Sequence, residues 1–408
     1  MKRNLRLIAL ILMLALLLSP APVLADEAIK VLSNSAVAEF PTRLVFFVSA
    51  EGTDDITDVR LHYRVDHLSF SDVTSEVYIG VTPSKKIETF WDWDMRRTGG
   101  LPPGTGIEYW WTLRDASGNQ TTTAPARFTF DDSRYDWQTL SKGQVTLLWY
   151  DGDEVFGQKL MDAVQRAEDR MAGITGAELM IPARIYIYAN TRDLQGSMIF
   201  PQEWTGGVTF TRYGIIAIGI AGDQLEWGAR AIAHELTHLV VDQLTLNPYN
   251  QLPTWLNEGL AMYSEGELTP SYREILARAA AEGLLLSVRS LSSPFSAYGD
   301  ISQLSYAQSY SIVESLISAY GQDKMFELLK LFKQGTEYDA ALLKIYGFAT
   351  DDLNVLWRNY LSTSTPVAAA ASAAGETLPV PVEYLVAAGA GVFLAGAYFG
   401  FKLWKRNR

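Results

Sequence analysis

The segment Ala231-Ile-Ala-His234-Glu235-Leu-Thr-His238-Leu-Val-Val241 lies near the middle of the 408-residue chain and decides how the surrounding sequence folds. Its two histidines are four positions apart, so on an α-helix both imidazoles lie on the same face. The apolar residues on either side predict a buried helix, which gives a metal site rigid support. With Glu235 the segment reads His-Glu-x-x-His, a pattern that predicts a zinc-binding helix.

The third ligand of such a site is predicted to be a carboxylate. A catalytic zinc takes three protein ligands and keeps one position open. The chain has four histidines and none follows His238, while His62 and His67 belong to a strand and a loop of an earlier region. Asp242 is excluded by geometry, because the eight residues from His234 to Asp242 rise by roughly 12 Å along one helix. The ligand must therefore come from another segment.

Glu258, twenty positions after His238, is the best candidate. It lies in Leu252-Pro-Thr-Trp-Leu-Asn-Glu258-Gly259, where Pro253 suits the start of a helix. The preceding Asn247-Pro248 turn lets this second helix run antiparallel to the first, and Gly259 permits their close approach. An ordinary helix start remains the alternative explanation.

These motifs resemble those of the gluzincin metallopeptidases, and most closely the peptidase MA-like domain proteins. The resemblance covers residues 144–361 and includes Trp255-Leu-Asn-Glu-Gly-Leu-Ala261. It implies an α+β zincin-like domain that binds one Zn²⁺ through His234, His238 and Glu258. Glu235 is implied to be the general base. The relatives also imply an oxyanion donor, for which the sequence offers Tyr306 or Tyr310, although packing roles for both stay open.

The chemistry of these residues agrees with the implied roles. A bound zinc lowers the pKa of its water toward ~7 and polarises a carbonyl. Glu235 is adjacent to His234 on the helix, so it is predicted to take a proton from that water and pass it to the leaving amine. The sequence contains no Gly-x-Met-x-Asn motif of the aminopeptidases, so an aminopeptidase assignment is unsupported. An endopeptidase is the expectation, and the choice between endo- and exopeptidase stays open.

The two ends of the chain predict export and anchoring. Residues 1–25 have a basic start, an apolar run and a small-residue site at Val23-Leu24-Ala25, as in a signal peptide, with an uncleaved anchor as the alternative. Residues 362–381 are predicted to be a Ser/Thr/Ala/Pro-rich stalk and residues 384–403 a transmembrane helix. The basic tail 404–408 would then be cytoplasmic. Gly396 and Gly400 form a small-xxx-small pair, which leaves dimerisation undecided.

The charge balance argues against a nucleic-acid partner. Setting aside the seven basic residues of the two ends leaves 27 of the 34 basic residues against 46 acidic ones. Nucleic-acid binding needs a basic face. The chain has no cysteine, so it has no disulfides and no thiolate ligands, which favours a bacterial or archaeal surface over an animal one.

The predicted architecture is multidomain. Residues 26–132 alternate apolar and polar in roughly seven short runs, which predicts an all-β sandwich resembling immunoglobulin or fibronectin modules. The next part is predicted to be a mixed sheet with a helical half after it. Its expected elements are strands at 145–150 and 183–189, a helix at 154–171, a hairpin at 208–220, and helices at 271–282, 303–320, 323–333, 338–346 and 351–360.

Two functional hypotheses follow. The first is a zinc peptidase at the cell surface that cleaves peptide or protein substrates. The second is a surface adhesion or scaffold protein, in which the sandwich binds a partner and the zinc is structural. A fourth Cys or His ligand would favour a structural site, and none is available. The sequence therefore favours the peptidase.

Overall fold

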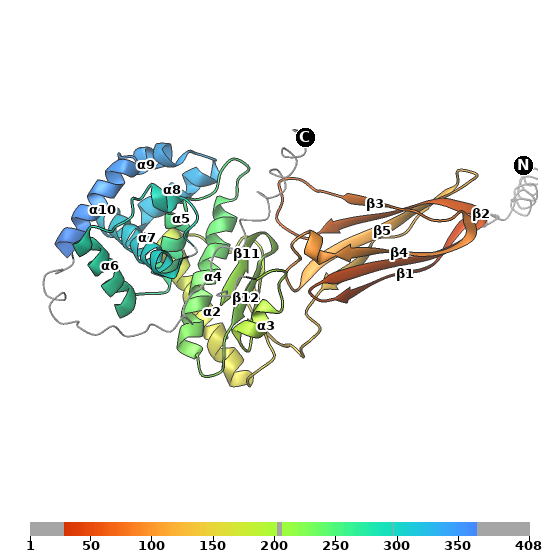
Figure 1. Cartoon of the computed structure of the whole chain (residues 1–408), viewed down its shortest axis with the longest axis horizontal. Helices are drawn as coiled ribbons and strands as arrows, with labels where there is room; N and C mark the ends of the chain where they lie inside the picture. The colour runs from red at the N-terminus through yellow and green to blue at the C-terminus, as the bar shows by residue number, and fades with distance from the viewer. Residues whose placement is uncertain (1–27, 202–205, 297, 365–408) are drawn as a thin grey trace, which may run out of the picture.

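The computed structural model describes residues 28–201, 206–296 and 298–364. A β-strand region occupies one end of an elongated molecule, and a mixed α/β sheet followed by helices occupies the other (Figure 1). The predicted signal peptide, transmembrane helix and cytoplasmic tail lie outside the described residues. Within the described ranges, no helix combines the length and the apolar character needed to cross a bilayer.

The β-strand region has the seven strands that the sequence predicts. They are β1 (Ile29–Glu39), β2 (Arg43–Val65), β3 (Ser75–Ile79), β4 (Ser84–Asp94), β5 (Thr105–Asp115), β6 (Gln120–Thr122) and β7 (Ala126–Phe130). The short 3-10 helix η1 (Met95–Arg97) follows β4. The likeness to an immunoglobulin or fibronectin module remains a prediction.

The long strand β2 joins all seven strands into one hydrogen-bonded network. Its first part pairs with β1 and β4, and its second part pairs with β3 and β5, with a register shift between Glu51 and Ile56. The two parts face each other: Phe46 contacts Tyr109 at 4.9 Å between ring centroids, and Tyr63 stacks on Trp91 at 5.5 Å. The alternating residues of both parts thus share one core.

The second sheet has the order β11-β12-β10-β9-β8. Its strands are β8 (Gln138–Lys142), β9 (Val145–Trp149), β10 (Ala183–Tyr188), β11 (Gly207–Phe210) and β12 (Ile215–Gly219). The predicted hairpin is confirmed: β11 and β12 are antiparallel and are joined through the 3-10 helix η2 (Thr211–Tyr213). Strand β8 was not predicted, and it extends the sheet to residues before the predicted domain start at 144.

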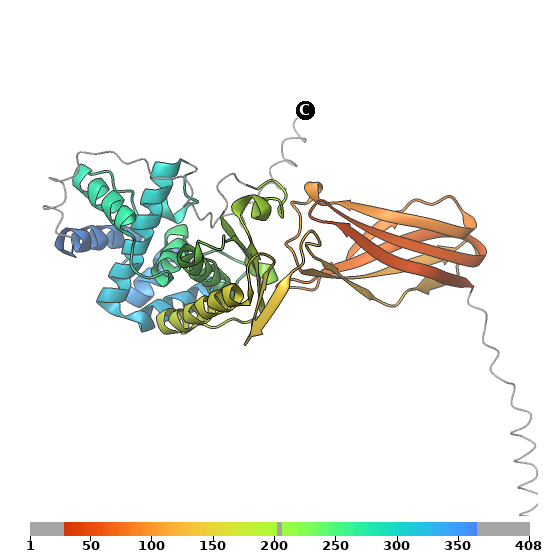
Figure 2. The same ribbon diagram turned by 90° about the horizontal axis from the view of Figure 1, so that it is seen from below.

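Both faces of this sheet are covered. One face packs against helices α2 (Glu154–Thr175) and α4 (Leu225–Thr245), as Figure 2 shows. The other face carries Tyr186 and Tyr188, whose hydroxyls donate to Asp131 at 3.0 Å and Asp132 at 2.9 Å. The short helix α3 (Thr191–Gln195) follows β10. Because Asp131 and Asp132 directly follow β7, these bonds tie the sheet to the β-strand region.

The helical half follows α4 as the sequence predicts, with ends shifted by a few residues. Its helices are α5 (Thr254–Ser264), α6 (Pro270–Glu282), α7 (Gly299–Tyr320), α8 (Gln322–Lys333), α9 (Tyr338–Tyr346) and α10 (Thr350–Ser364), with the 3-10 helix η3 (Ser290–Ser292) before α7. Helix α10 continues into the first residues of the predicted stalk. The Ser362 hydroxyl donates to the Arg358 carbonyl at 3.0 Å, across one turn of the helix. The Ser- and Thr-rich composition of this segment does not reveal such a bond.

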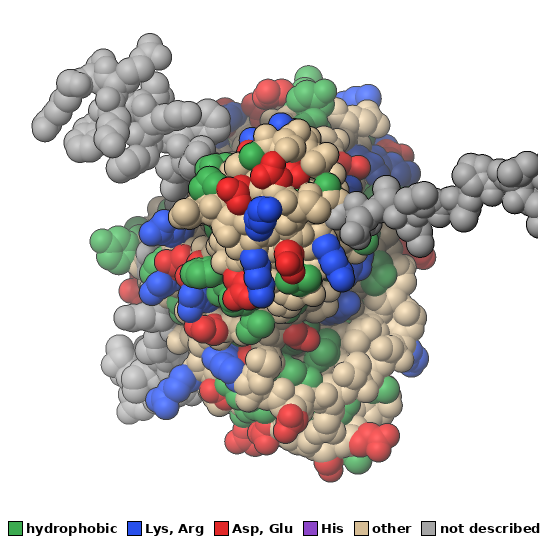
Figure 3. Space-filling view, turned by 90° about the vertical axis from the view of Figure 1, so that its right-hand side faces the viewer, with side chains coloured by type: hydrophobic (Ala, Val, Ile, Leu, Met, Phe, Trp, Pro, Cys, Tyr) green, Lys and Arg blue, Asp and Glu red, His purple; other side chains and the backbone are tan. Residues whose placement is uncertain are grey.

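Charged side chains of both signs are interspersed at the end of the molecule formed by the β-strand region (Figure 3). Ion pairs of the β-strand region include Arg43 with Asp92 at 2.8 Å and Arg60 with Asp58 at 2.9 Å. On the face that the figure shows, no basic stripe of the kind that binds nucleic acid gathers among the described residues.

Candidate metal centre

Helix α4 carries the His-Glu-x-x-His segment through the centre of the molecule. His234 is 1% exposed and His238 is 5% exposed, and Glu235 between them is fully buried. The apolar residues that flank them pack into the largest core of the chain, between α2, the sheet and α5. The predicted burial of this helix is therefore confirmed.

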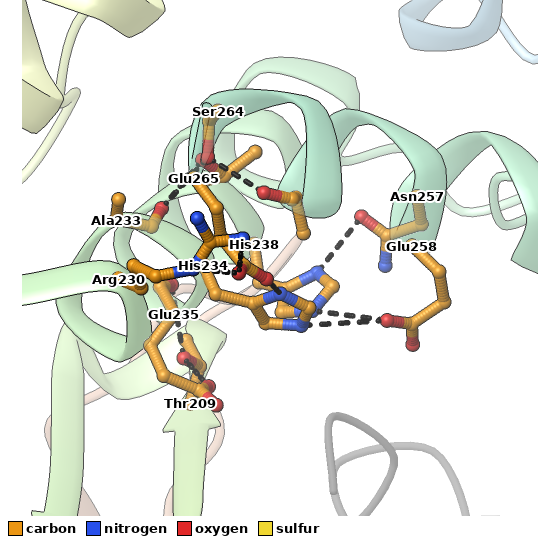
Figure 4. A network of polar contacts seen from close by, with 12 residues as sticks. Thr209, Arg230, Ala233, His234, Glu235, His238, Asn257, Glu258, Ser264 and Glu265 are labelled. Atoms are coloured by element: carbon orange, nitrogen blue, oxygen red, sulfur yellow. Dashed lines mark hydrogen bonds and ion pairs between the residues drawn. The ribbon is translucent and has the colours of Figure 1, made fainter. Parts of the chain in front are cut away.

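Helix α5 brings Glu258 to the two histidines. The Oε2 atom of Glu258 lies 3.5 Å from Nε2 of His234 and 3.5 Å from Nε2 of His238. Asn257 contacts His238 and Glu265 contacts His234, so the two helices run in opposite directions, as predicted. Figure 4 shows the Glu258 carboxylate pointing at both imidazoles from the facing helix.

The three donor atoms have the spacing of a zinc site. Ligand atoms of His234, His238 and Glu258 all lie within 4.8 Å of one another. Metal–ligand bonds of ~2.1 Å in a tetrahedral arrangement place neighbouring ligand atoms about 3.4 Å apart. The observed 3.5 Å separations agree with this value.

The same three atoms are buried without a hydrogen-bond partner. Nε2 of His234, Nε2 of His238 and Oε2 of Glu258 all belong to this group. A buried polar atom that lacks a partner costs about 1–3 kcal/mol. Three such atoms directed at one another fit a bound cation, and imidazole nitrogens with a carboxylate oxygen are donors that Zn²⁺ accepts.

The site's own electrostatics favour a positive charge among these groups. Burial lowers the pKa of His234, but the neighbouring carboxylates of Glu258 and Glu265 outweigh this effect and raise the pKa to about 10. Burial also opposes a charge on His238, and Glu258 reverses that effect, so the pKa of His238 is raised as well. Burial raises the pKa of Glu258, yet the two histidines lower it overall. The pocket therefore stabilises a carboxylate beside a cationic centre.

Two further residues orient the imidazoles and were not found from the sequence. Nδ1 of His234 lies 2.8 Å from Oε1 of Glu265, and Nδ1 of His238 lies 3.2 Å from Oδ1 of Asn257. Arg230 in turn binds Glu265 at 3.0 Å. Partners of this kind fix the ring so that the other nitrogen faces the metal. Glu265 follows the last residue of α5, and its seven-residue spacing from Glu258 was its only sequence signal.

Glu235 is held by strand β11. The Thr209 hydroxyl lies 2.6 Å from Oε2 of Glu235, while Oε1 is buried without a partner. A Cβ atom at Gly207 would lie 2.8 Å from that same Oε1. Burial raises the pKa of Glu235, against the lowering effect of the two histidines. A raised pKa suits a carboxylate that takes up and returns a proton.

Of the two candidate tyrosines, Tyr306 is the one whose ring lies beside His234. Its ring centroid is 6.5 Å from that of His234 and 5.2 Å from that of Phe295. Burial, followed by the charge of Glu258, raises its pKa well above the ordinary value, so its hydroxyl keeps its proton. The Tyr310 hydroxyl instead donates to Glu314 at 3.2 Å.

The remaining candidates lie outside the ligand group. Asp242 is half-buried beside Thr211, and burial raises its pKa to about 6. His62 binds the Thr112 hydroxyl at 3.1 Å and stacks on Trp110, and His67 binds the Val65 carbonyl at 2.8 Å. Within the described residues, His234, His238 and Glu258 form the one group with metal-ligand spacing.

A protein-family model supports the predicted resemblance to the peptidase MA-like proteins. Residues 163–363 match the model of the Peptidase MA superfamily. An M1 zinc metallopeptidase from Deinococcus radiodurans matches with 12% identity over 81% of this chain and 94% of its own, at a TM-score of 0.38. A two-domain M1 zinc metallopeptidase bound to L-arginine matches with 11% identity over 84% of this chain and 96% of its own, at a TM-score of 0.37. A search of curated proteins gives no match.

The superfamily match spans α4, α5 and α7, and so contains His234, Glu235, His238, Glu258 and Tyr306. Residues 163–363 therefore carry a Peptidase MA superfamily domain.

Proposed function

We propose that this protein is a zinc-dependent peptidase of the gluzincin type, and that it acts as an endopeptidase. The observation that supports this most strongly is the convergence of three buried, unpartnered donor atoms on α4 and α5 next to a buried carboxylate. The superfamily match supports the same reaction class at the family level.

The ligand count favours a catalytic zinc over a structural one. Structural zinc sites are closed by four protein ligands, whereas catalytic sites have three and keep one position open. Within the described residues, the ligand group contains two histidines and one glutamate and no fourth member. This observation supports the peptidase over a scaffold protein with a structural metal.

In the proposed mechanism, His234, His238 and Glu258 hold the metal, with Glu265 and Asn257 fixing the orientation of the imidazoles. A zinc bound there would lower the pKa of a water to ~7 and polarise the scissile carbonyl. Oε1 of Glu235 has no partner in the fold, so it is free to accept a proton from the attacking water. Glu235 then delivers that proton to the leaving amine, in the manner of a general base that becomes a general acid.

Tyr306 is proposed to donate a hydrogen bond to the developing oxyanion. Its ring lies beside His234, and its raised pKa keeps the hydroxyl protonated, as a donor requires. Anchoring at the cell surface, through residues 384–403 after export directed by residues 1–25, is part of the proposal and is supported by the sequence alone.

The test compares wild-type protein with Glu235→Gln on a library of peptides, with zinc content measured in parallel. Loss of general-base catalysis typically costs 10²–10⁴-fold in rate, and the variant keeps all three ligands, so it is expected to lose cleavage and retain zinc. Glu226→Gln is the matched control, because Glu226 is an exposed glutamate in the first turn of the same helix. Equal cleavage by wild type and Glu235→Gln would contradict the proposal.

A further inference from the structure

The buried Glu235 carboxylate is in contact with two residues of one strand. Gly207 and Thr209 are two positions apart on β11, so they face the same side of the sheet. That side faces α4, as the contacts of both residues with Glu235 show. Figure 4 shows Glu235 reaching from the helix to Thr209, away from Glu258.

Thr209 supplies the hydrogen bond that fixes one carboxylate oxygen. Its Oγ1 atom lies 2.6 Å from Oε2 of Glu235 and 3.0 Å from the main-chain oxygen of the same residue. A hydroxyl has one proton to donate. A distance of 2.6 Å falls in the range of O–H···O⁻ bonds to ionised carboxylates, so the proton goes to Oε2.

Gly207 defines where the other oxygen lies. A Cβ atom at this position would be 2.8 Å from Oε1 and 3.3 Å from Cδ of Glu235. The carboxylate thus occupies the space that any other side chain at residue 207 would need. Because the obstructing atoms are the end of a flexible side chain, alanine at residue 207 would displace the carboxylate and leave the backbone in place.

We infer that Gly207 and Thr209 form a seat on β11 that positions the Glu235 carboxylate, with Oε2 bound by Thr209 and Oε1 left free for proton transfer. Thr209 is a positioning residue, because it acts through Glu235. The inference rests on the proposed peptidase function, since positioning matters only where Glu235 acts as a base. It assigns a role in catalysis to β11, which lies outside the His-Glu-x-x-His motif.

The expected kinetic signature separates positioning from support of the fold. A displacement of about 1 Å at a reacting group can cost about 10²-fold in rate. Thr209→Val removes the hydroxyl at nearly constant volume, so kcat is expected to fall by about that factor. The KM and the zinc content are expected to stay at wild-type values, because Glu235 binds neither the substrate in its ground state nor the metal.

The experiment measures kcat, KM and zinc content of the full chain, with the peptide that wild type cleaves best in the library. Thr209→Ser is expected to restore kcat, because serine keeps the hydroxyl. Gly207→Ala is expected to lower kcat while the protein remains folded. Thr245→Val is the matched control: Thr245 is a buried threonine on α4 whose hydroxyl bonds the Val241 carbonyl at 2.8 Å.

A wild-type kcat in Thr209→Val would overturn the inference, and so would a Thr209→Ser variant as impaired as Thr209→Val. Loss of zinc in Thr209→Val would also overturn it, because the residue would then support the metal site as a whole. Crystal structures of wild type and Thr209→Val give a readout that does not depend on cleavage. If the Glu235 carboxylate keeps its position in Thr209→Val, the inference is contradicted. If wild type cleaves no peptide, only the proposed function is contradicted.

Discussion

The molecule contains two pairs of histidines, and only one pair has the surroundings of a metal site. In the β-strand region, Nε2 of His62 binds a threonine hydroxyl, and His67 is an exposed residue that binds a backbone carbonyl. On α4, His234 and His238 bind side-chain oxygens through Nδ1, while their buried Nε2 atoms have no hydrogen-bond partner.

The difference lies in what each ring nitrogen contacts. Glu76 lies near His62 at 3.7 Å, so a neighbouring carboxylate alone does not make a site. At His234 one carboxylate orients the ring from behind and a second lies in front of it. A metal site therefore requires an oriented ring, a free nitrogen and a second donor that converges on the same point.

Removing a ligand histidine is expected to have the largest effect. His234→Ala or His238→Ala should weaken zinc binding by more than the about 10–100-fold typical of losing an outer partner, because a metal–ligand bond itself is lost. Elemental analysis of the dialysed protein measures this. The double variant His62→Ala/His67→Ala is the control and should keep wild-type zinc. Loss of zinc in the control would mean that the β-strand region binds the metal.

The carboxylates that contact Nδ1 of His234 and of His62 allow a test of whether the orientation of the ring matters for zinc binding. Glu265→Gln is expected to weaken zinc binding by about 10–100-fold, because the amide is a poorer partner for Nδ1 of His234. Competition with a chelator of known affinity measures the change. Glu76→Gln makes the same chemical change beside His62 and should leave zinc affinity unaltered. An unchanged affinity in Glu265→Gln would show that Glu258 and the helix alone fix the ring.

Substituting one glycine in the helical half and one in the β-strand region compares how tightly the two regions are packed. The sequence predicts that Gly259 lets α5 approach α4, but a Cβ atom at Gly259 would clash with the Ser309 backbone oxygen of α7, so that prediction is wrong about the partner helix. A Cβ atom at Gly80 after β3 would meet nothing within 4 Å. Gly259→Ala is expected to lower the free energy of unfolding by about 1–3 kcal/mol, since helix backbones must separate. Gly80→Ala should change it by less than about 0.5 kcal/mol. Urea denaturation of both variants measures these values, and equal stabilities would contradict the close approach of α5 and α7.

The smallest effect is expected at an exposed carboxylate of the helical half. The Thr350 hydroxyl and backbone N–H lower the pKa of Asp339 below its ordinary value. The ionised carboxylate therefore stabilises the fold at pH values above the ordinary pKa of an aspartate. This contribution is lost as the pH falls through the lowered pKa of Asp339. Asp339→Asn should be less stable than wild type at pH 7, and the gap should narrow in acid. Thermal unfolding from pH 7 to pH 2 measures it, and a gap independent of pH would contradict this sign.

The convergence of His234, His238 and Glu258 could be predicted because its signals are local. The spacing of His234 and His238 sets one helix face, and the Asn247-Pro248 turn before Pro253 lets Glu258 return to that face. Helices and strands with strong periodicity were predicted for the same reason. Sequence periodicity reports which side of an element is buried, and that was enough to place α4 in the core.

The residues that complete the site could not be predicted because their partners are distant in sequence. Thr209 meets Glu235 from 26 positions away, and Glu265 meets His234 from 31 positions away. No pattern within β11 distinguishes Thr209 from any other strand threonine. The same limit applies to β2, whose continuous 23-residue path through Gly52 is set by its pairing with four other strands.

The proposed function depends on whether His234, His238 and Glu258 hold one zinc ion. A crystal structure of the zinc-loaded protein, with anomalous data collected on both sides of the zinc absorption edge, tests it most directly. One anomalous peak is expected at ~2.0–2.2 Å from Nε2 of each histidine and from a carboxylate oxygen of Glu258. No peak among these three residues, or a peak held by a different set of side chains, would contradict it.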